Sequence, residues 1–82
     1  MDEVQIVENF GTMWKVSYRG TTYIVDRRAR GRLFQDVYLV TDHSGSPVQT
    51  RVWADSVEHA VTKGRAQLEP TLVARYNKLQ TI

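Results

Sequence analysis

The chain has 82 residues, of which 41% are apolar and 24% are charged, and its formal net charge is +2. This composition excludes a disordered chain, and the length predicts a single domain over residues 1–82 with a small core. The absence of cysteine excludes disulfides, thiolate metal sites and cysteine nucleophiles. No apolar run reaches the roughly 20 residues of a membrane span, and the acidic start is unlike a signal peptide. We therefore expect a cytoplasmic protein with no membrane partner.

The first two predicted strands are separated by a short turn. Val4–Phe10 is the first predicted strand, and Gly11–Thr12 has the composition of a turn. In the segment Met13–Arg19, large apolar residues recur at every second position. This period predicts a second strand with one apolar face.

A hairpin is predicted next. Gly20–Thr21 has glycine at the first central position of a two-residue turn, which is typical of a type II′ hairpin. This turn predicts a third strand that ends at Arg27, with Tyr18 opposite Tyr23 and Trp14 opposite Arg27. We interpret the aromatic residues as core and expect Trp14 to hold Arg27 to the sheet.

A cluster of arginines follows the hairpin. The segment Arg27–Arg32, which we call the arginine loop, contains four of the eight arginines of the chain. Because the guanidinium group is always charged and suits phosphates and carboxylates, the loop has three interpretations. It is a solvated loop without a specific role, a contact to phosphates, or a contact to an acidic patch on a protein. Its free charges are expected to be Arg28, Arg30 and Arg32.

Two further strands follow the arginine loop. A segment that begins at Phe34 or Asp36 and ends at Thr41 is apolar on both faces, as in a central strand. After a turn, Val48–Ala54 alternates again, with Gln, Arg and Trp on the face predicted to point away from the helix.

The polar face of the fifth strand carries two candidate contact residues. An exposed tryptophan beside an arginine is typical of protein interfaces. Arg51 and Trp53 are therefore candidate contact residues.

The hydrophobic period changes from 2 to 3.6 after the fifth strand. Asp55 is the expected N-cap, with Glu58 three residues later as in a capping box, and Pro70 is expected to end the helix. Gly64 lies on the apolar stripe, which indicates a close approach of the helix to the sheet. Thr71–Leu79 alternates and is interpreted as a last strand, although its apolar residues also fit a helix face.

Together these elements predict an α+β fold in the order β-β-β-β-β-α-β. The fold is an antiparallel sheet of five or six strands with one helix packed on one face. The N-terminal strand is expected to be a sheet edge. Because an unpaired edge can accept another strand, a homodimer through that edge is expected.

The sequence contains little that indicates catalysis. His43 and His59 have no partner at a metal-ligand spacing, and the serines do not match a nucleophile motif. Gly31, a lone glycine of the arginine loop, is expected to supply backbone freedom. We therefore predict no enzymatic activity, no catalytic residue, no cofactor and no metal site.

The second half of the chain resembles the layout of very small phage-encoded proteins. The stretch Val37–Leu79 has a strand, a polar turn, a second strand that ends in Val-Trp-Ala-Asp-Ser-Val-Glu-His-Ala at residues 52–60, a helix and a last strand. This layout is similar to that of small phage inhibitors of host RNA polymerase and of several anti-CRISPR proteins. The resemblance implies a protein that binds a host machine and blocks it, and no functional residue is transferred from it.

The predicted function is a small non-enzymatic binding protein that regulates a host protein. Its predicted partner-binding residues are Arg28, Arg30, Arg32, Arg51 and Trp53. The alternative is a nucleic-acid-binding domain in which the three arginines of the loop contact phosphates. That alternative predicts an affinity that falls steeply with salt.

Overall fold

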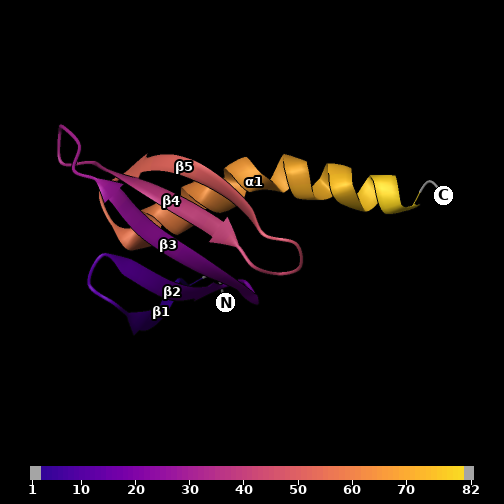
Figure 1. Cartoon of the computed structure of the whole chain (residues 1–82), viewed down its shortest axis with the longest axis horizontal. Helices are drawn as coiled ribbons and strands as arrows, with labels where there is room; N and C mark the ends of the chain where they lie inside the picture. The colour runs from indigo at the N-terminus through magenta and orange to yellow at the C-terminus, as the bar shows by residue number, and fades with distance from the viewer. Residues whose placement is uncertain (1–2, 81–82) are drawn as a thin grey trace.

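The structure is a computed structural model that describes residues 3–80, with the side chains of residues 3–74. In this part of the chain five strands are followed by one helix (Figure 1). The elements are β1 Gln5–Asn9, β2 Met13–Tyr18, β3 Thr21–Ala29, β4 Asp36–Asp42, β5 Val48–Ala54 and α1 Val57–Gln80.

The strands form one antiparallel sheet in the order β1-β2-β3-β4-β5, so each strand pairs with its neighbour in the sequence. The helix α1 lies across one face of this sheet, mainly over β4 and β5 (Figure 1). The prediction of an α+β fold with an antiparallel sheet and one helix on one face is confirmed. Within residues 3–80 the sheet has five strands, and its other face is open.

The predicted register of the β2–β3 hairpin is wrong by two residues. The turn consists of Arg19 and Gly20, with φ angles of 50° and 76°, and Tyr18 lies opposite Thr21. Two positive φ angles are typical of a type I′ turn, whose twist matches that of the flanking strands. Because the shift is an even number of residues, every side chain keeps its predicted face.

The core lies between α1 and the sheet. Its centre consists of buried valines from four strands that pack against the helix. A Cβ atom placed on Gly64 would lie 2.7 Å from the Cβ of Val40, so only glycine allows this approach of helix and sheet. The predicted role of Gly64 is confirmed. Besides Gly64, the buried residues are Trp14, Val16, Tyr18, Tyr23, Val25, Tyr38, Val40, Asp42, Val52, Ala54, Val57, Ala60, Val61 and Leu68.

The predicted strand Thr71–Leu79 is wrong, because α1 continues through Pro70 to the end of the described chain. Proline removes one N–H donor and crowds the carbonyl four residues earlier. Pro70 and Ala66 are both exposed, so water can solvate that carbonyl. Buried Leu68 and half-buried Leu72 continue one helical stripe. The last turns of the helix extend beyond the sheet (Figure 1).

The N-cap of α1 is Ser56, not Asp55. The Ser56 side-chain oxygen accepts a hydrogen bond from the backbone N–H of His59 at 3.1 Å, and its carbonyl accepts the first helical bond, from Ala60 at 3.0 Å. Both bonds are those of an N-cap residue. The predicted pairing with Glu58 as a capping box is therefore wrong by one position.

The described part of the chain contains no helix long and apolar enough to cross a membrane.

Candidate contact surface

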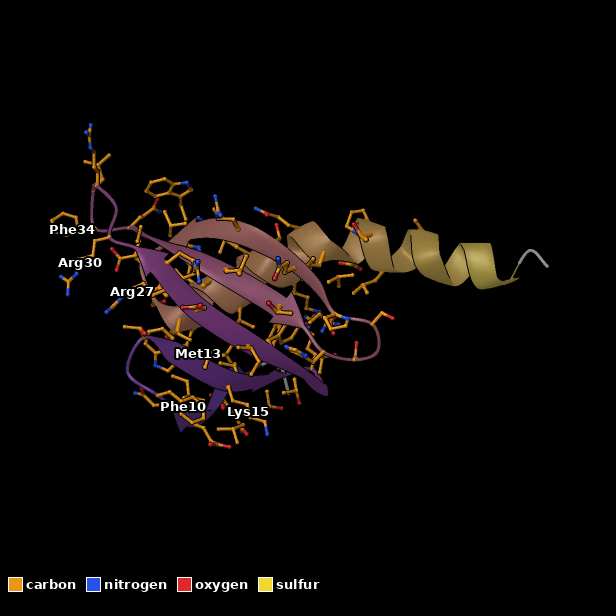
Figure 2. All side chains as sticks on the ribbon, viewed as in Figure 1. Phe10, Met13, Lys15, Arg27, Arg30 and Phe34 are labelled. Atoms are coloured by element: carbon orange, nitrogen blue, oxygen red, sulfur yellow. The ribbon has the colours of Figure 1, made fainter. Side chains whose placement is uncertain are left out.

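The candidate site lies at the end of the sheet where β3 passes into β4. Residues 30–35 connect these strands and extend beyond the sheet, and Figure 2 shows Arg30 and Phe34 beyond the end of β3. Arg27, by contrast, lies on the sheet itself (Figure 2). Its guanidinium carbon lies 5.9 Å from the centre of the Trp14 ring. The predicted contact between Arg27 and Trp14 is confirmed, although the two residues are diagonal neighbours and not opposite each other.

The base of the connection is fixed by short contacts. The Gly31 N–H donates to Asp36 Oδ1 at 3.1 Å, and the Gln35 N–H donates to the Arg32 carbonyl at 3.2 Å. A Cβ atom on Gly31 would collide with the Gln35 carbonyl and would lie 2.5 Å from the Trp53 ring. Gly31 is needed for space, and its φ is not among the positive ones. The expectation that it supplies backbone freedom is therefore wrong.

The five predicted contact residues are all exposed and lie on adjoining elements. Arg30 and Arg32 belong to the connection, and Arg28 lies near the end of β3, where its Nη1 is 3.1 Å from Asp26 Oδ2. Arg51 and Trp53 are two residues apart on β5 and point to the open face of the sheet. The structure brings Trp53 against Gly31, so the β5 residues adjoin the arginine loop.

The open face supplies an apolar floor beside Trp53. Trp53 lies opposite half-buried Val37, and Arg51 lies opposite half-buried Leu39. Trp53 itself is 52% exposed, so one side of its ring contacts the protein and the other side meets solvent. An aromatic ring held in this way loses little conformational entropy when a partner covers it.

Two residues of this surface were missed by the sequence reasoning. Leu33 is 89% exposed and Phe34 is 98% exposed at the tip of the connection. The sequence predicts a strand that begins at Phe34 or Asp36, and this prediction gives Phe34 no role in a contact surface. One signal in the sequence could have indicated them. Leu33 and Phe34 are two adjacent apolar residues directly after the arginine loop, and they do not fit the alternation of apolar and polar residues that a half-buried strand would show. We call Arg28, Arg30, Arg32, Leu33, Phe34, Arg51 and Trp53 the loop surface.

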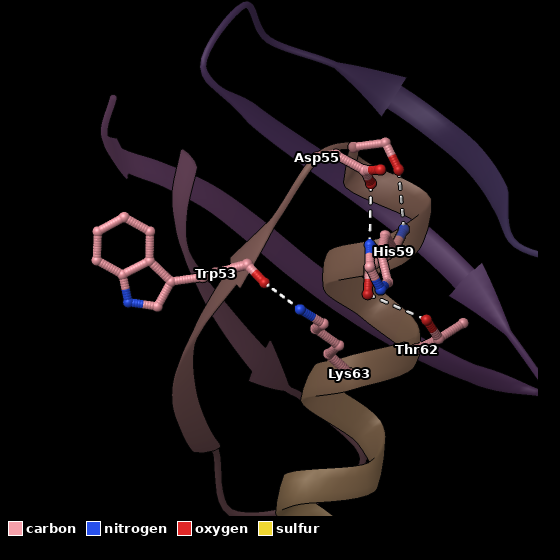
Figure 3. Close-up of polar contacts among 6 residues, drawn as sticks. Trp53, Asp55, His59, Thr62 and Lys63 are labelled. Atoms are coloured by element: carbon pink, nitrogen blue, oxygen red, sulfur yellow. Dashed lines mark hydrogen bonds and ion pairs between the residues drawn. The ribbon is translucent and has the colours of Figure 1, made fainter. Parts of the chain in front are cut away.

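The two histidines do not belong to the loop surface. His43 is exposed in the β4–β5 turn. His59 Nδ1 lies 2.9 Å from Asp55 Oδ1 at the start of α1, while Lys63 Nζ donates to the Trp53 carbonyl at 2.6 Å (Figure 3). These contacts fasten the helix start to the end of β5. The hydrogen bond from His59 holds the pKa of the Asp55 carboxyl below its ordinary value of 3.8.

The described residues contain no group of three or more His, Cys, Asp or Glu side chains that could hold a metal ion.

Tyr38 lies behind the loop surface on the helix-covered face, and burial together with the carboxylate of Asp36 raises its pKa above 10.0. Its phenol therefore stays neutral at physiological pH and acts as core.

The hollows described on the protein lie away from the loop surface. A shallow groove of about 650 Å³ runs between the N-terminal segment and the start of α1, and a smaller hollow of about 130 Å³ lies at the other end of the sheet. None of their lining residues belongs to the loop surface. Small molecules bind in concave sites, whereas the connection that carries most of the loop surface protrudes beyond the sheet (Figure 2).

No protein-family model matches the chain, and no curated protein or solved structure is significantly similar to it. The resemblance to small phage inhibitors therefore stays a prediction.

Proposed function

We propose that the chain is a non-enzymatic binding module that contacts an acidic surface of a protein partner through the loop surface. A small phage-type regulator of a host protein is the biological role that this proposal favours. The support is physical: exposed arginines surround exposed apolar side chains, and arginine with aromatic residues is the composition typical of binding hot spots.

One observation carries the proposal. The Trp53 ring packs against Gly31 of the arginine loop. Two sets of residues, predicted separately from a loop and from a strand, therefore form one continuous surface. Arg30 and Arg32 lie on one side of this contact and Arg51 on the other, so a partner that covers Trp53 would meet arginine on both sides.

A direct test compares two sets of alanine substitutions. The triple variant Arg28→Ala, Arg30→Ala and Arg32→Ala leaves Arg27 on Trp14 and should keep the fold. The control variant is Lys15→Ala with Arg19→Ala, of which Arg19 lies at the opposite end of the β2–β3 hairpin. We expect the wild type and the control to retain the same protein in a pull-down, and the triple variant to lose it. Equal retention by all three proteins would refute the proposal.

Nucleic acid is the second candidate partner, and the exposed Phe34 ring favours it because its connection also carries Arg30 and Arg32. Such a ring can stack on an unpaired base while arginines contact phosphates. A titration of labelled single-stranded and duplex DNA and RNA at two salt concentrations tests this. If the affinity at low salt is measurable and falls about as expected for three phosphate contacts, nucleic acid is the partner. If no binding is seen at low salt, this candidate is excluded.

A further inference from the structure

The tip of the β3–β4 connection exposes more apolar surface per residue than any other described part of the chain. Leu33 and Phe34 are 89% and 98% exposed, and the next most exposed large apolar residue is Phe10 at 57%. Single exposed apolar residues are ordinary on protein surfaces. Two adjacent ones that are almost completely solvated are a site where a partner gains by burying them.

The backbone holds this tip in an unfavourable conformation. Leu33 and Phe34 have φ angles of 56° and 62°, in the left-handed region that residues with large side chains rarely adopt. Such conformations persist only where the surroundings fix them, and they concentrate at ligand-binding segments. Here the hydrogen bonds of Gly31 and Gln35 fix the base on both sides of the tip.

We infer that Leu33 and Phe34 are the anchor of the interface, inserted into an apolar pocket of the protein partner whose rim carries carboxylates. This inference rests on the proposed function and specifies the partner. The apolar tip requires a pocket, and Arg30 and Arg32 on its N-terminal side require negative charge at the rim of that pocket. Arg28 is paired with Asp26, so it contributes less to this complementarity than the two arginines of the connection.

A fixed tip distinguishes between classes of partner. A bilayer and a stack of bases accept an apolar side chain in many orientations, so neither rewards a backbone held in a left-handed conformation. A folded protein pocket has a fixed shape, and a side chain already held in the bound direction loses less entropy on entering it. The backbone of Leu33 and Phe34 therefore favours a protein pocket.

The experiment begins with a photo-crosslinking phenylalanine analogue at position 34 of the full chain, expressed in cells of its source, with the same analogue at position 10 as control. The protein crosslinked from position 34 is purified, and its crosslinked segment is identified by mass spectrometry. We expect that segment to line an apolar pocket bordered by Asp or Glu. If position 34 crosslinks no protein above the level of position 10, the anchor is overturned, and the pull-down with the triple arginine variant decides the proposed function separately.

Titration of the purified partner then separates the two proposals. We expect Phe34→Ala to lower the affinity about 30-fold or more, as for a hot-spot residue, and Phe10→Ala to change it less than about 2-fold. Phe34→Asn tolerates the left-handed backbone, so it should keep or raise the thermal midpoint while losing the same affinity. If Phe34→Ala binds as the wild type does while the triple arginine variant does not, the anchor is refuted and the proposed function stands.

Discussion

Two glycines determine how closely other groups approach the backbone. Gly64 allows α1 to contact Val40, and Gly31 allows the Trp53 ring to rest on the β3–β4 connection. In both places the lack of a side chain supplies room, and neither glycine has a positive φ. A single methyl group added at either position should therefore disturb the packing around it.

Gly64→Ala should destabilise the protein. Overpacking a core costs about 1–3 kcal/mol, and replacing helical glycine by alanine returns about 1 kcal/mol of helix propensity. The net loss in the free energy of unfolding should therefore be roughly 0–2 kcal/mol, measured by urea denaturation. Ala66→Gly, at an exposed site on the same helix, is the control and should cost about 1 kcal/mol from propensity alone. A more stable Gly64→Ala variant would contradict the packing of Gly64 on Val40.

Gly31→Ala should move Trp53 off the connection. The added methyl group would collide with the Gln35 carbonyl and the Trp53 ring, so the ring should turn further into solvent. Iodide quenching of tryptophan fluorescence should increase, because Trp14 is buried and Trp53 is 52% exposed. The increase should disappear in a Trp53→Phe background, and unchanged quenching in the wild-type background would show that the ring does not rest on Gly31.

The Asp55–His59 contact should give a measurable pH dependence. The pKa of Asp55 is lowered by the hydrogen bond from His59, so the contact stabilises the fold above pH 3.8 and is lost as pH falls through the lower folded value. His59→Ala should return the pKa of Asp55 toward 3.8. A carbon-detected NMR titration of the Asp55 carboxyl measures both values, and an identical pKa in wild type and variant would rule out the contact.

At the scale of elements, alternation and period were enough to predict all five strands and the start of the helix within a few residues. The hairpin register was not predictable in this way, because Arg19 is an unusual residue for the first position of a type I′ turn and Gly20–Thr21 is an equally plausible turn. The helix beyond Pro70 was missed because proline normally ends a helix, and its cost here depends on solvation of Ala66, which only the structure reveals.

The same limits apply to the loop surface. Arginine clustering and the strand face of Trp53 were readable from local sequence, so five of the seven candidate residues of the loop surface were predicted. Their contact through Gly31 depends on tertiary packing, and the exposure of Leu33 and Phe34 depends on a left-handed backbone that nothing in a Leu-Phe pair indicates. Local patterns therefore located the charges and missed the apolar tip between them and β4.

Pro70→Ala should stabilise the protein. It restores a hydrogen bond to the carbonyl of Ala66 and removes the steric conflict of the ring, at a position where both side chains are exposed. The propensity difference of about 3 kcal/mol is an upper limit, and the distance from the core reduces the expected gain to about 1–2 kcal/mol in urea denaturation. Helical ellipticity at low denaturant should change little, because the helix is already formed, and a large rise would show that the segment after Pro70 is frayed.

At the scale of the molecule, the sheet has two edges within the described residues, β1 and β5. On β5, Lys63 of α1 bonds the Trp53 carbonyl. On β1 all residues are exposed, including Ile6 and Val7, and a bulge interrupts the pairing between Ile6 and Glu8. Exposed apolar residues favour the addition of another strand, whereas a bulge disfavours it. Whether the expected homodimer forms therefore depends on which of these two effects is larger at β1.

Sedimentation velocity at two protein concentrations checks the expected homodimer. If β1 pairs with a second copy, the sedimentation coefficient should rise with concentration, and Val7→Lys should abolish the rise by placing a charge on the edge. Ala29→Lys, on the exposed end of β3, is the control. A coefficient that does not depend on concentration would show that β1 is left unpaired.

The order of the strands also has a consequence for folding. Each strand pairs with its sequence neighbour, so every sheet contact closes a short stretch of chain, and chains with local contacts fold fast for their size. The cover of the core, however, belongs to the last element: Val16, Val25 and Val40 are buried under a helix that begins only at Val57. A chain emerging from the ribosome can therefore form its hairpins early, but it cannot close its core until the first three turns of α1 have been synthesised.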